Sequence, residues 1–259
     1  PAGPAWFLWV LLMFDLLAAA VYAVVPGVGA ALGRVCGNLS RRPILYFVAL
    51  IVVSALAYLP MAAAFDAQDW RSFGPFWVQI SRLAHYAAYF VAGMGLGAAG
   101  LSQGLFAPAG KLARRWPLWV LASLGGFVIA IAAFLIIMST FKTGGPGPIL
   151  STLGNFAFVL SCACSSLACI ALFVRFAGKP NRFFDSLSTH AYGIFLLHYA
   201  CVSWLQYALL GSDLPGAAKA ALVFIGAVAA SWGVMEVLRR ARTFRAIGPT
   251  GSLREHPIA

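Results

Sequence analysis

Long apolar runs alternate with short polar and basic segments along most of the chain. A helix that crosses a bilayer needs about 20 consecutive, mostly apolar residues. The pattern therefore predicts an all-α fold, a polytopic membrane bundle of about seven transmembrane helices, with Lys219 and Glu236 inside the ends of the last one. The expected helices are Ala5–Val25, Pro43–Phe65, Ser81–Leu101, Pro117–Phe141, Ile149–Val174, Leu187–Leu210 and Ala217–Leu238.

The composition supports a membrane location. Hydrophobic residues make up 62% of the 259 positions and charged residues only 10%, against about 25% charged in typical soluble domains. A soluble protein of this length could not cover its surface with so few charges. We therefore expect the lipid bilayer to be the main partner of the chain.

The basic residues fall mainly on one side of the predicted helices. Segments 26–42, 102–116, 175–186 and 239–259 hold 14 of the 18 lysines and arginines. Basic loops stay in the cytoplasm, so this pattern predicts a cytoplasmic C-terminus and an outward-facing start, in a bacterial-type cytoplasmic (inner) membrane. The net charge of +11 is then a topology signal, and nucleic acid is not an expected partner.

The same pattern suggests a simple domain organisation. Residues 1–242 are expected to form a single transmembrane domain, and residues 243–259 a basic cytoplasmic tail. The chain begins at Pro1, almost directly in a hydrophobic span, and its predicted start faces outward. Both features are those expected of a piece of a longer protein.

Neither the cysteines nor the glycine-rich stretch predicts a metal or cofactor site. Cys162, Cys164 and Cys169 lie in one apolar run without a nearby His, Asp or Glu. The stretch GLGAAG at 95–100 matches a dinucleotide-binding pattern, but it closes an apolar helix instead of following a strand. The overlapping GMGLG at 93–97 is typical of close helix packing in membranes. We therefore expect packing roles for these residues, no metal and no bound cofactor.

Two predicted spans carry polar residues that are costly in hydrocarbon. Asp15 lies near the centre of the first span, where it has either a functional role or a hydrogen-bonding role between helices. Arg82 and His85 are one helical turn apart in the outer half of the third span, with Tyr86 and Tyr89 nearby. They form either an external polar pocket for a sugar or anionic group, or an interfacial belt of snorkelling and aromatic side chains.

The sixth span carries two histidines. His190, Ile194 and His198 fall at i, i+4 and i+8 on roughly one face, and Tyr192 and Tyr199 form a neighbouring stripe. His198 lies about 16 Å along the helix from its expected start, near the membrane midplane. It is either a neutral histidine bonded across helices or part of a polar cavity that substrate uses.

The stretches at residues 3–17, 89–97 and 187–210 together resemble the acyltransferase type 3 family of integral membrane acyltransferases. The segment LSTHAYGIFLLHYACVSWLQYALL, residues 187–210, is similar to the family's late Tyr-Gly-Ile-Tyr-Leu-Leu-His segment, with Phe195 and Ala200 in place of a usual Tyr and a frequent Pro. GPAWFLWVLLMFDLL at 3–17 resembles its Trp-Phe-Leu span, and YFVAGMGLG at 89–97 its aromatic-then-Gly span. The three occur in the family's order and frame most of the chain.

The resemblance implies a membrane O-acyltransferase, or its C-terminal portion, that transfers an acyl group, commonly acetyl, to a carbohydrate or glycan hydroxyl. Acyl-CoA is the implied co-substrate. Family members have further helices upstream, so this chain would supply the last seven. The family's general-base His lies on the first helix, and no equivalent is present here, so the catalytic residue is unknown. Asp15 and His198 are the remaining candidates, with His198 favoured as a cavity-lining residue.

The expected site residues follow from the same reasoning. Those expected to bind substrate are Trp6, Arg82, His85, Tyr89, Tyr192 and His198. Those expected to hold the phosphates of acyl-CoA by charge, from the predicted cytoplasmic side, are Arg41, Arg42, Arg114 and Arg115. Two alternatives to the enzyme stay open: a transporter or flippase-like protein, and a non-catalytic remnant of the family. The sequence does not indicate an oligomeric state.

Overall fold

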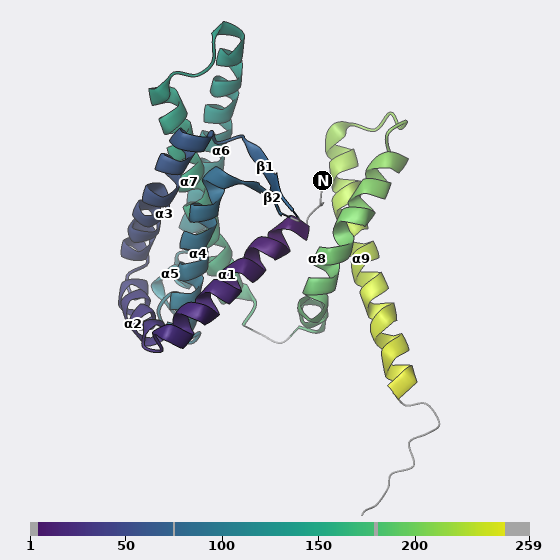
Figure 1. Ribbon diagram of the computed structural model, residues 1–259. Helices are drawn as coiled ribbons and strands as arrows, with labels where there is room; N and C mark the ends of the chain where they lie inside the picture. The colour runs from purple at the N-terminus through teal and green to yellow at the C-terminus, as the bar shows by residue number, and fades with distance from the viewer. Residues whose placement is uncertain (1–4, 75, 179–180, 247–259) are drawn as a thin grey trace, which may run out of the picture. The chain divides into compact units, whose positions relative to one another are not determined.

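The fold was analysed in a computed structural model that describes residues 5–74, 76–178 and 181–246. These residues form helices with one short hairpin, and they divide into two compact units, one with residues 6–178 and one with residues 181–246 (Figure 1). The longer helices of the first unit are α1 (Ala5–Val24), α2 (Val28–Ser40), α3 (Pro43–Phe65), α4 (Ile80–Ala99), α6 (Trp116–Thr140) and α7 (Pro148–Phe176). The second unit contains α8 (Arg182–Ala208) and α9 (Gly216–Ala246).

The predicted all-α class is confirmed, and each of the seven predicted spans lies on a helix. Five helices of the described chain are long and apolar enough to cross a membrane: α1, α3, α6, α7 and α9. The other two, α4 and α8, are long enough but carry more polar residues, such as Ser81 and Arg82 on α4. The number of seven transmembrane helices therefore stays a prediction.

Two connections contain structure that the apolar pattern did not predict. The segment 26–42, taken as a loop, contains α2, which is too short and too rich in glycine to read as a span. The segment between α3 and α4 contains an antiparallel hairpin of β1 (Trp70–Phe73) and β2 (Phe76–Gln79), paired from Trp70 opposite Gln79 to Phe73 opposite Phe76. Because β2 runs directly into α4, the hairpin fixes where α4 begins.

The core of the first unit lies where α3, α4 and α7 pack together. Tyr46 and Leu50 of α3 contact Leu96 of α4 and Leu167 of α7 in one buried cluster. α6 packs along α7, and α2 packs along α4. The short helices η1 (Gly104–Phe106) and α5 (Lys111–Arg114) close this end of the core with Leu105 and Leu112, both fully buried.

The glycine-rich part of α4 packs differently from the prediction. A Cβ on Gly93 or Gly97 would meet nothing within 4 Å among the described residues, so this GxxxG pair does not make the expected contact. Gly95, between them, does: a Cβ there would lie 3.0 Å from both Cys36 Cβ and Leu32 Cγ of α2. Close packing is therefore present at this stretch, but only through the middle glycine.

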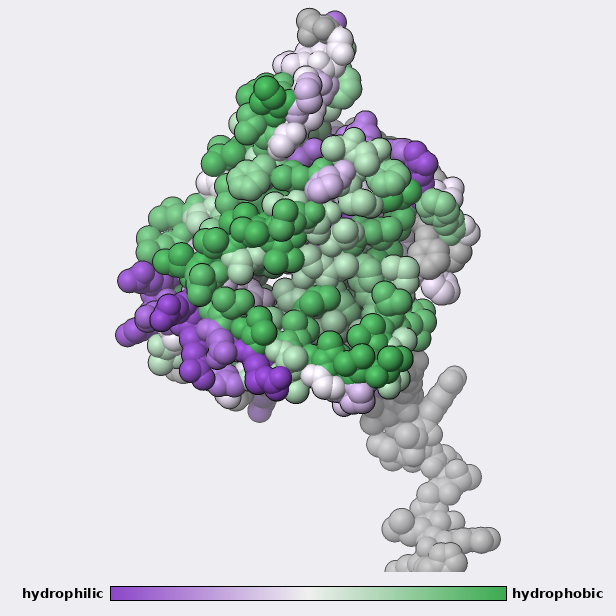
Figure 2. Space-filling model, turned by 60° about the vertical axis from the view of Figure 1, so that its left-hand side comes forward, coloured by the Kyte–Doolittle hydropathy of each residue, from purple (hydrophilic) through white to green (hydrophobic). Residues whose placement is uncertain are grey.

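Outside the core, the helices expose apolar side chains to their surroundings. On α6, Leu121, Val128 and Leu135 are each about 60% exposed. Most of the face in Figure 2 is hydrophobic, with hydrophilic residues gathered near its upper and lower ends. Such a surface is suited to contact with lipid acyl chains, and the protein is a multi-pass membrane protein.

Candidate functional site

Seven polar or aromatic side chains meet between α3, α4 and α7, and we call this group the α3–α4–α7 cluster. The residues that each helix supplies are three, four or seven positions apart, so they lie on one face of that helix. The members are Ser54, Tyr58, Arg82, His85, Tyr89, Asn155 and Phe158. All belong to the first unit.

His85 lies at the centre of the cluster, inside a group of aromatic rings. It is only 3% exposed. Its ring centroid lies 4.8 Å from that of Tyr89, 5.4 Å from Phe158 and 5.5 Å from Tyr58. Aromatic walls of this kind hold His85 in one place.

Hydrogen bonds connect the helices of the cluster. The Tyr58 hydroxyl donates to Oδ1 of Asn155 at 3.3 Å, which joins α3 to α7. Ser54 donates to the carbonyl of Leu50 on its own helix at 2.6 Å. The Tyr58 side chain is 1% exposed and Ser54 is fully buried, so these contacts are shielded from solvent.

Arg82 brings a positive charge to the cluster without a carboxylate beside it. Its Cζ lies 4.8 Å from the centroid of the Phe158 ring, a cation–π contact. The ion pairs of the described residues join Asp69 or Glu236 to other cations, so none of them involves Arg82. The cluster is therefore electropositive, and it favours an anionic or strongly polarised oxygen.

Several buried polar atoms around α4 have no hydrogen-bond partner among the described residues. They are Gln79 Oε1, Ser81 Oγ, Arg82 Nε, both ring nitrogens of His85 and the Tyr89 hydroxyl. Leaving such groups buried and unsatisfied costs about 1–3 kcal/mol each. They include both donors and acceptors, which is the combination that a hydroxyl-bearing molecule satisfies.

Trp6 extends the aromatic surface from α1. Its ring lies 6.3 Å from that of Tyr86 and 5.7 Å from that of Trp70 on the hairpin. Tyr86 in turn lies 6.4 Å from His85. Four of the six residues predicted to bind substrate, namely Trp6, Arg82, His85 and Tyr89, thus lie at or next to the cluster.

The other two, Tyr192 and His198, lie on α8 in the second unit. Tyr192 is 67% exposed, and His198 is partly buried. Nδ1 of His198 lies 2.5 Å from the carbonyl oxygen of Phe195. A carbonyl only accepts, so Nδ1 is the donor in this contact. The structure thus gives His198 a bond within its own helix, where a bond across helices was one expectation.

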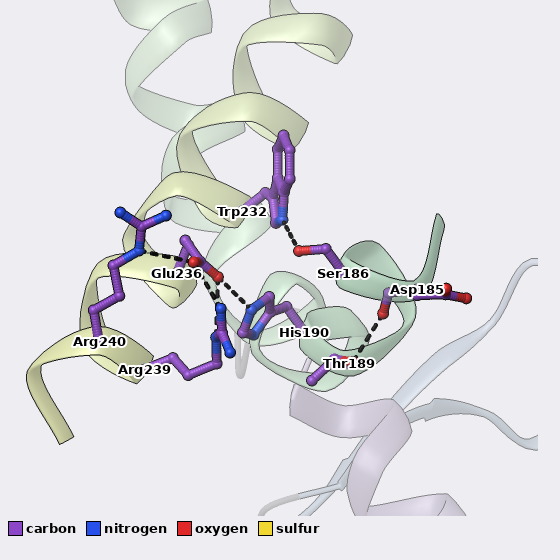
Figure 3. Close-up of polar contacts among 8 residues, drawn as sticks. All are labelled: Asp185, Ser186, Thr189, His190, Trp232, Glu236, Arg239 and Arg240. Carbon is purple, nitrogen blue, oxygen red and sulfur yellow. Dashed lines mark hydrogen bonds and ion pairs between the residues drawn. The ribbon is translucent and has the colours of Figure 1, made fainter. Parts of the chain in front are cut away.

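A second polar group joins α8 to α9, as Figure 3 shows. His190 Nε2 lies 3.0 Å from Oε2 of Glu236, and His190 is 5% exposed. Glu236 also pairs with Arg239 at 2.8 Å and Arg240 at 2.9 Å. One turn earlier, Trp232 Nε1 donates to Ser186 Oγ at 3.0 Å. These contacts hold the two helices in register.

The remaining predicted residues lie on the surface of the first unit. Asp15 is exposed on α1, which does not place it between helices of the described chain. Arg41, Arg42, Arg114 and Arg115 are also exposed. Of these four, Arg41 lines a cavity between α2 and the end of α4. No group of three or more metal-ligating side chains occurs among the described residues.

Sequence reasoning missed the α3 and α7 members of the cluster. Tyr58 and Asn155 are polar residues inside strongly apolar spans, which was an available signal. Their pairing was not predictable, because they are 97 positions apart. Glu236 was treated as a helix-end residue, and its contact with His190 was likewise missed.

Comparison with known proteins identifies the family of the chain. A family model described as an acyltransferase domain matches residues 1–236, which include the cluster and the His190–Glu236 pair. No curated protein and no solved structure matches the chain. Because the family model covers well over half of the residues, the chain belongs to the acyltransferase 3 family of membrane proteins.

Proposed function

We propose that the chain acts as an integral membrane O-acyltransferase, or as part of one, and that the α3–α4–α7 cluster binds the acceptor hydroxyl. The observation that carries this proposal is the set of buried, unpartnered polar atoms around His85 and Arg82. A packed core does not concentrate such atoms in one place unless a ligand or solvent satisfies them.

The chemistry of the cluster favours a carbohydrate or glycan as acceptor. A sugar ring has an apolar face, which stacks on aromatic rings such as those of Trp6 and Tyr89, and a rim of hydroxyls that both donate and accept hydrogen bonds. His85 and Gln79 offer acceptor atoms, and Arg82 offers donors. An acetyl group is the smallest acyl group that this family commonly transfers, and we propose acetyl-CoA as its source.

The reaction balances with these groups in stated roles. The acceptor oxygen forms a bond to the thioester carbonyl carbon, the carbon–sulfur bond breaks, and the hydroxyl proton is finally carried by the released thiol. His85 accepts a hydrogen bond from the attacking hydroxyl of the acceptor. This bond orients a lone pair of the acceptor oxygen toward the carbonyl carbon. Arg82 places positive charge where the carbonyl oxygen becomes negative.

Position along the helices supports an outward-facing acceptor site in the inner membrane. The loop charges predict that α3 runs from the cytoplasm outward, and that α4 and α7 run back. Tyr58 lies late in α3, whereas His85 and Asn155 lie early in their helices. All three then fall in the outer half of the bilayer, so the thioester end of a cytoplasmic donor has to reach into the membrane to meet the acceptor.

Replacing Arg82 tests this function. Membranes that contain the full-length protein are given radiolabelled acetyl-CoA, and label in the glycan fraction is followed. Arg82→Gln is expected to lower the rate by about 10- to 100-fold, the effect of losing a charged hydrogen bond, and Arg82→Lys to restore part of it. If both variants transfer acetyl at the wild-type rate, the cluster is not the acceptor site.

A transport assay separates the enzyme from the alternative of a transporter. If wild-type membranes move an acylated or glycan species without transferring label to a hydroxyl, the protein is a transporter and the proposal is wrong.

A further inference from the structure

A cavity of about 400 Å³ lies between α2 and the end of α4, far along the helices from the α3–α4–α7 cluster. Its volume is within the range of about 300–1,000 Å³ that is usual for small-molecule sites. Arg34, Asn38 and Arg41 line it on one side, and Gln103 and Gly104 line it on the other. The family resemblance assigned no role to this cavity.

One wall of the cavity is a polar face of α2. Arg34, Asn38 and Arg41 are spaced i, i+4 and i+7, so their side chains lie along the same side of the helix. Two guanidinium groups and one amide provide several N–H donors in a short distance. A row of donors without acidic residues is the arrangement that binds phosphate oxygens.

Small residues form the floor and keep it open. A Cβ on Gly33 would lie 3.0 Å from the backbone of Ala98, and a Cβ on Gly37 would lie 3.2 Å from Ala99 Cβ. α2 and α4 therefore approach each other closely at these two glycines. The floor is therefore fixed by backbone packing.

The opposite wall is also held in place. Gly104 has a positive φ of 62° and lies directly against Ser40 of α2, where any side chain would collide. The Gln103 amide donates to the Ala99 carbonyl and so closes the end of α4. Contacts within the protein therefore form this wall, and no ligand is needed to form it.

The charge of this site is not neutralised by the protein. Neither Arg34 nor Arg41 takes part in an ion pair or a side-chain hydrogen bond within the described ranges, and the acidic residues described in the first unit are Asp15, Asp66 and Asp69. Segments 26–42 and 102–116, which build the two walls, were independently predicted to share the cytoplasmic side. Their meeting at one cavity agrees with that prediction.

We propose that this cavity binds a phosphate ester, with Arg34 and Arg41 as its charged contacts, and that the ligand is the nucleotide end of acyl-CoA. The identification of the donor rests on the proposed function, whereas the phosphate chemistry rests on the cavity alone. Of the four arginines predicted to hold acyl-CoA phosphates, this assignment keeps Arg41, adds Arg34, and leaves out Arg42, Arg114 and Arg115, which do not line the cavity.

Binding of CoA to the purified full-length protein tests the proposal. Arg34→Gln and Arg41→Gln, combined, are expected to weaken CoA binding at least tenfold and to flatten its dependence on salt. Arg42→Gln is the matched control, because Arg42 is adjacent to Arg41, equally charged and exposed, but outside the cavity. It is expected to change CoA binding less than twofold.

A second arm distinguishes a lipid from the soluble donor. The same variants are tested for binding to vesicles that contain phosphatidylglycerol. Loss of vesicle binding with unchanged CoA binding would keep the phosphate site and replace acyl-CoA by a phospholipid headgroup. If the double variant equals Arg42→Gln in both assays, the cavity is not a phosphate site. If the double variant loses CoA binding while Arg82→Gln transfers acetyl at the normal rate, the phosphate site stands. The acceptor site proposed at the α3–α4–α7 cluster is then wrong.

Discussion

The Tyr58 hydroxyl of α3 donates a 3.3 Å hydrogen bond to Oδ1 of Asn155 on α7. The bond joins residues 97 positions apart and places Asn155 against the rings around His85. It therefore determines the shape of one side of the candidate acceptor site.

Removing this hydroxyl should impair acyl transfer. Tyr58→Phe keeps the ring but frees Asn155, and we expect the rate at low acceptor concentration to fall by about threefold to tenfold, as for one neutral hydrogen bond. Tyr46→Phe is the matched control: Tyr46 is also buried on α3, and its hydroxyl donates to the Ala92 carbonyl at 3.4 Å, outside the cluster. Equal effects of the two variants would mean that Tyr58 acts only through stability.

Two glycines of α4 should respond in opposite ways to alanine. Gly95→Ala forces a Cβ against Cys36 and Leu32 of α2, and we expect a loss of about 1–3 kcal/mol in the free energy of unfolding. Gly97→Ala meets open space and gains helix propensity, so we expect no loss and up to about 1 kcal/mol of stabilisation. Denaturant unfolding in detergent measures both. A destabilising Gly97→Ala would show that this face packs against something else.

The α8–α9 contact should depend on Glu236 more than on either arginine. Glu236→Gln removes the charge that faces His190, Arg239 and Arg240 together, so the melting temperature in detergent should fall. Arg240→Gln removes one exposed pair and should change the melting temperature little. A larger effect from Arg240→Gln would contradict the central role of Glu236.

The predicted orientation is open to a labelling test. In a cysteine-free background, Asp213→Cys, between α8 and α9, should react with an impermeant maleimide from outside intact cells. Lys111→Cys, exposed on α5, should react only after the membrane is permeabilised. The reverse pattern would invert the assigned topology.

The sequence predicted helices well, and faces within one helix well, because both follow from local spacing. Arg82, His85 and Tyr89 were expected on one side of a helix, and the structure places all three in the same cluster. The contact of that side with Tyr58 and Asn155 was not predictable, because periodicity does not say which helices meet.

The two structural surprises have a similar cause. α2 is short, and its buried face consists of Gly33, Cys36 and Ser40, so hydropathy alone shows no element there. Its stability comes from close packing on α4, which is a tertiary property. The Gly93–Gly97 pair matched a packing motif, yet Gly95 makes the contact. The motif specifies the spacing of the glycines but not which side of the helix faces its neighbour.

The central claim, that the α3–α4–α7 cluster binds the acceptor, is tested most directly at His85. The measurement is the initial rate of acetyl transfer from labelled acetyl-CoA to membrane glycan by wild type and His85→Gln, at equal amounts of folded protein. We expect a fall of at least about tenfold, because His85 is the buried acceptor at the centre of the cluster. An unchanged rate in folded His85→Gln would contradict it.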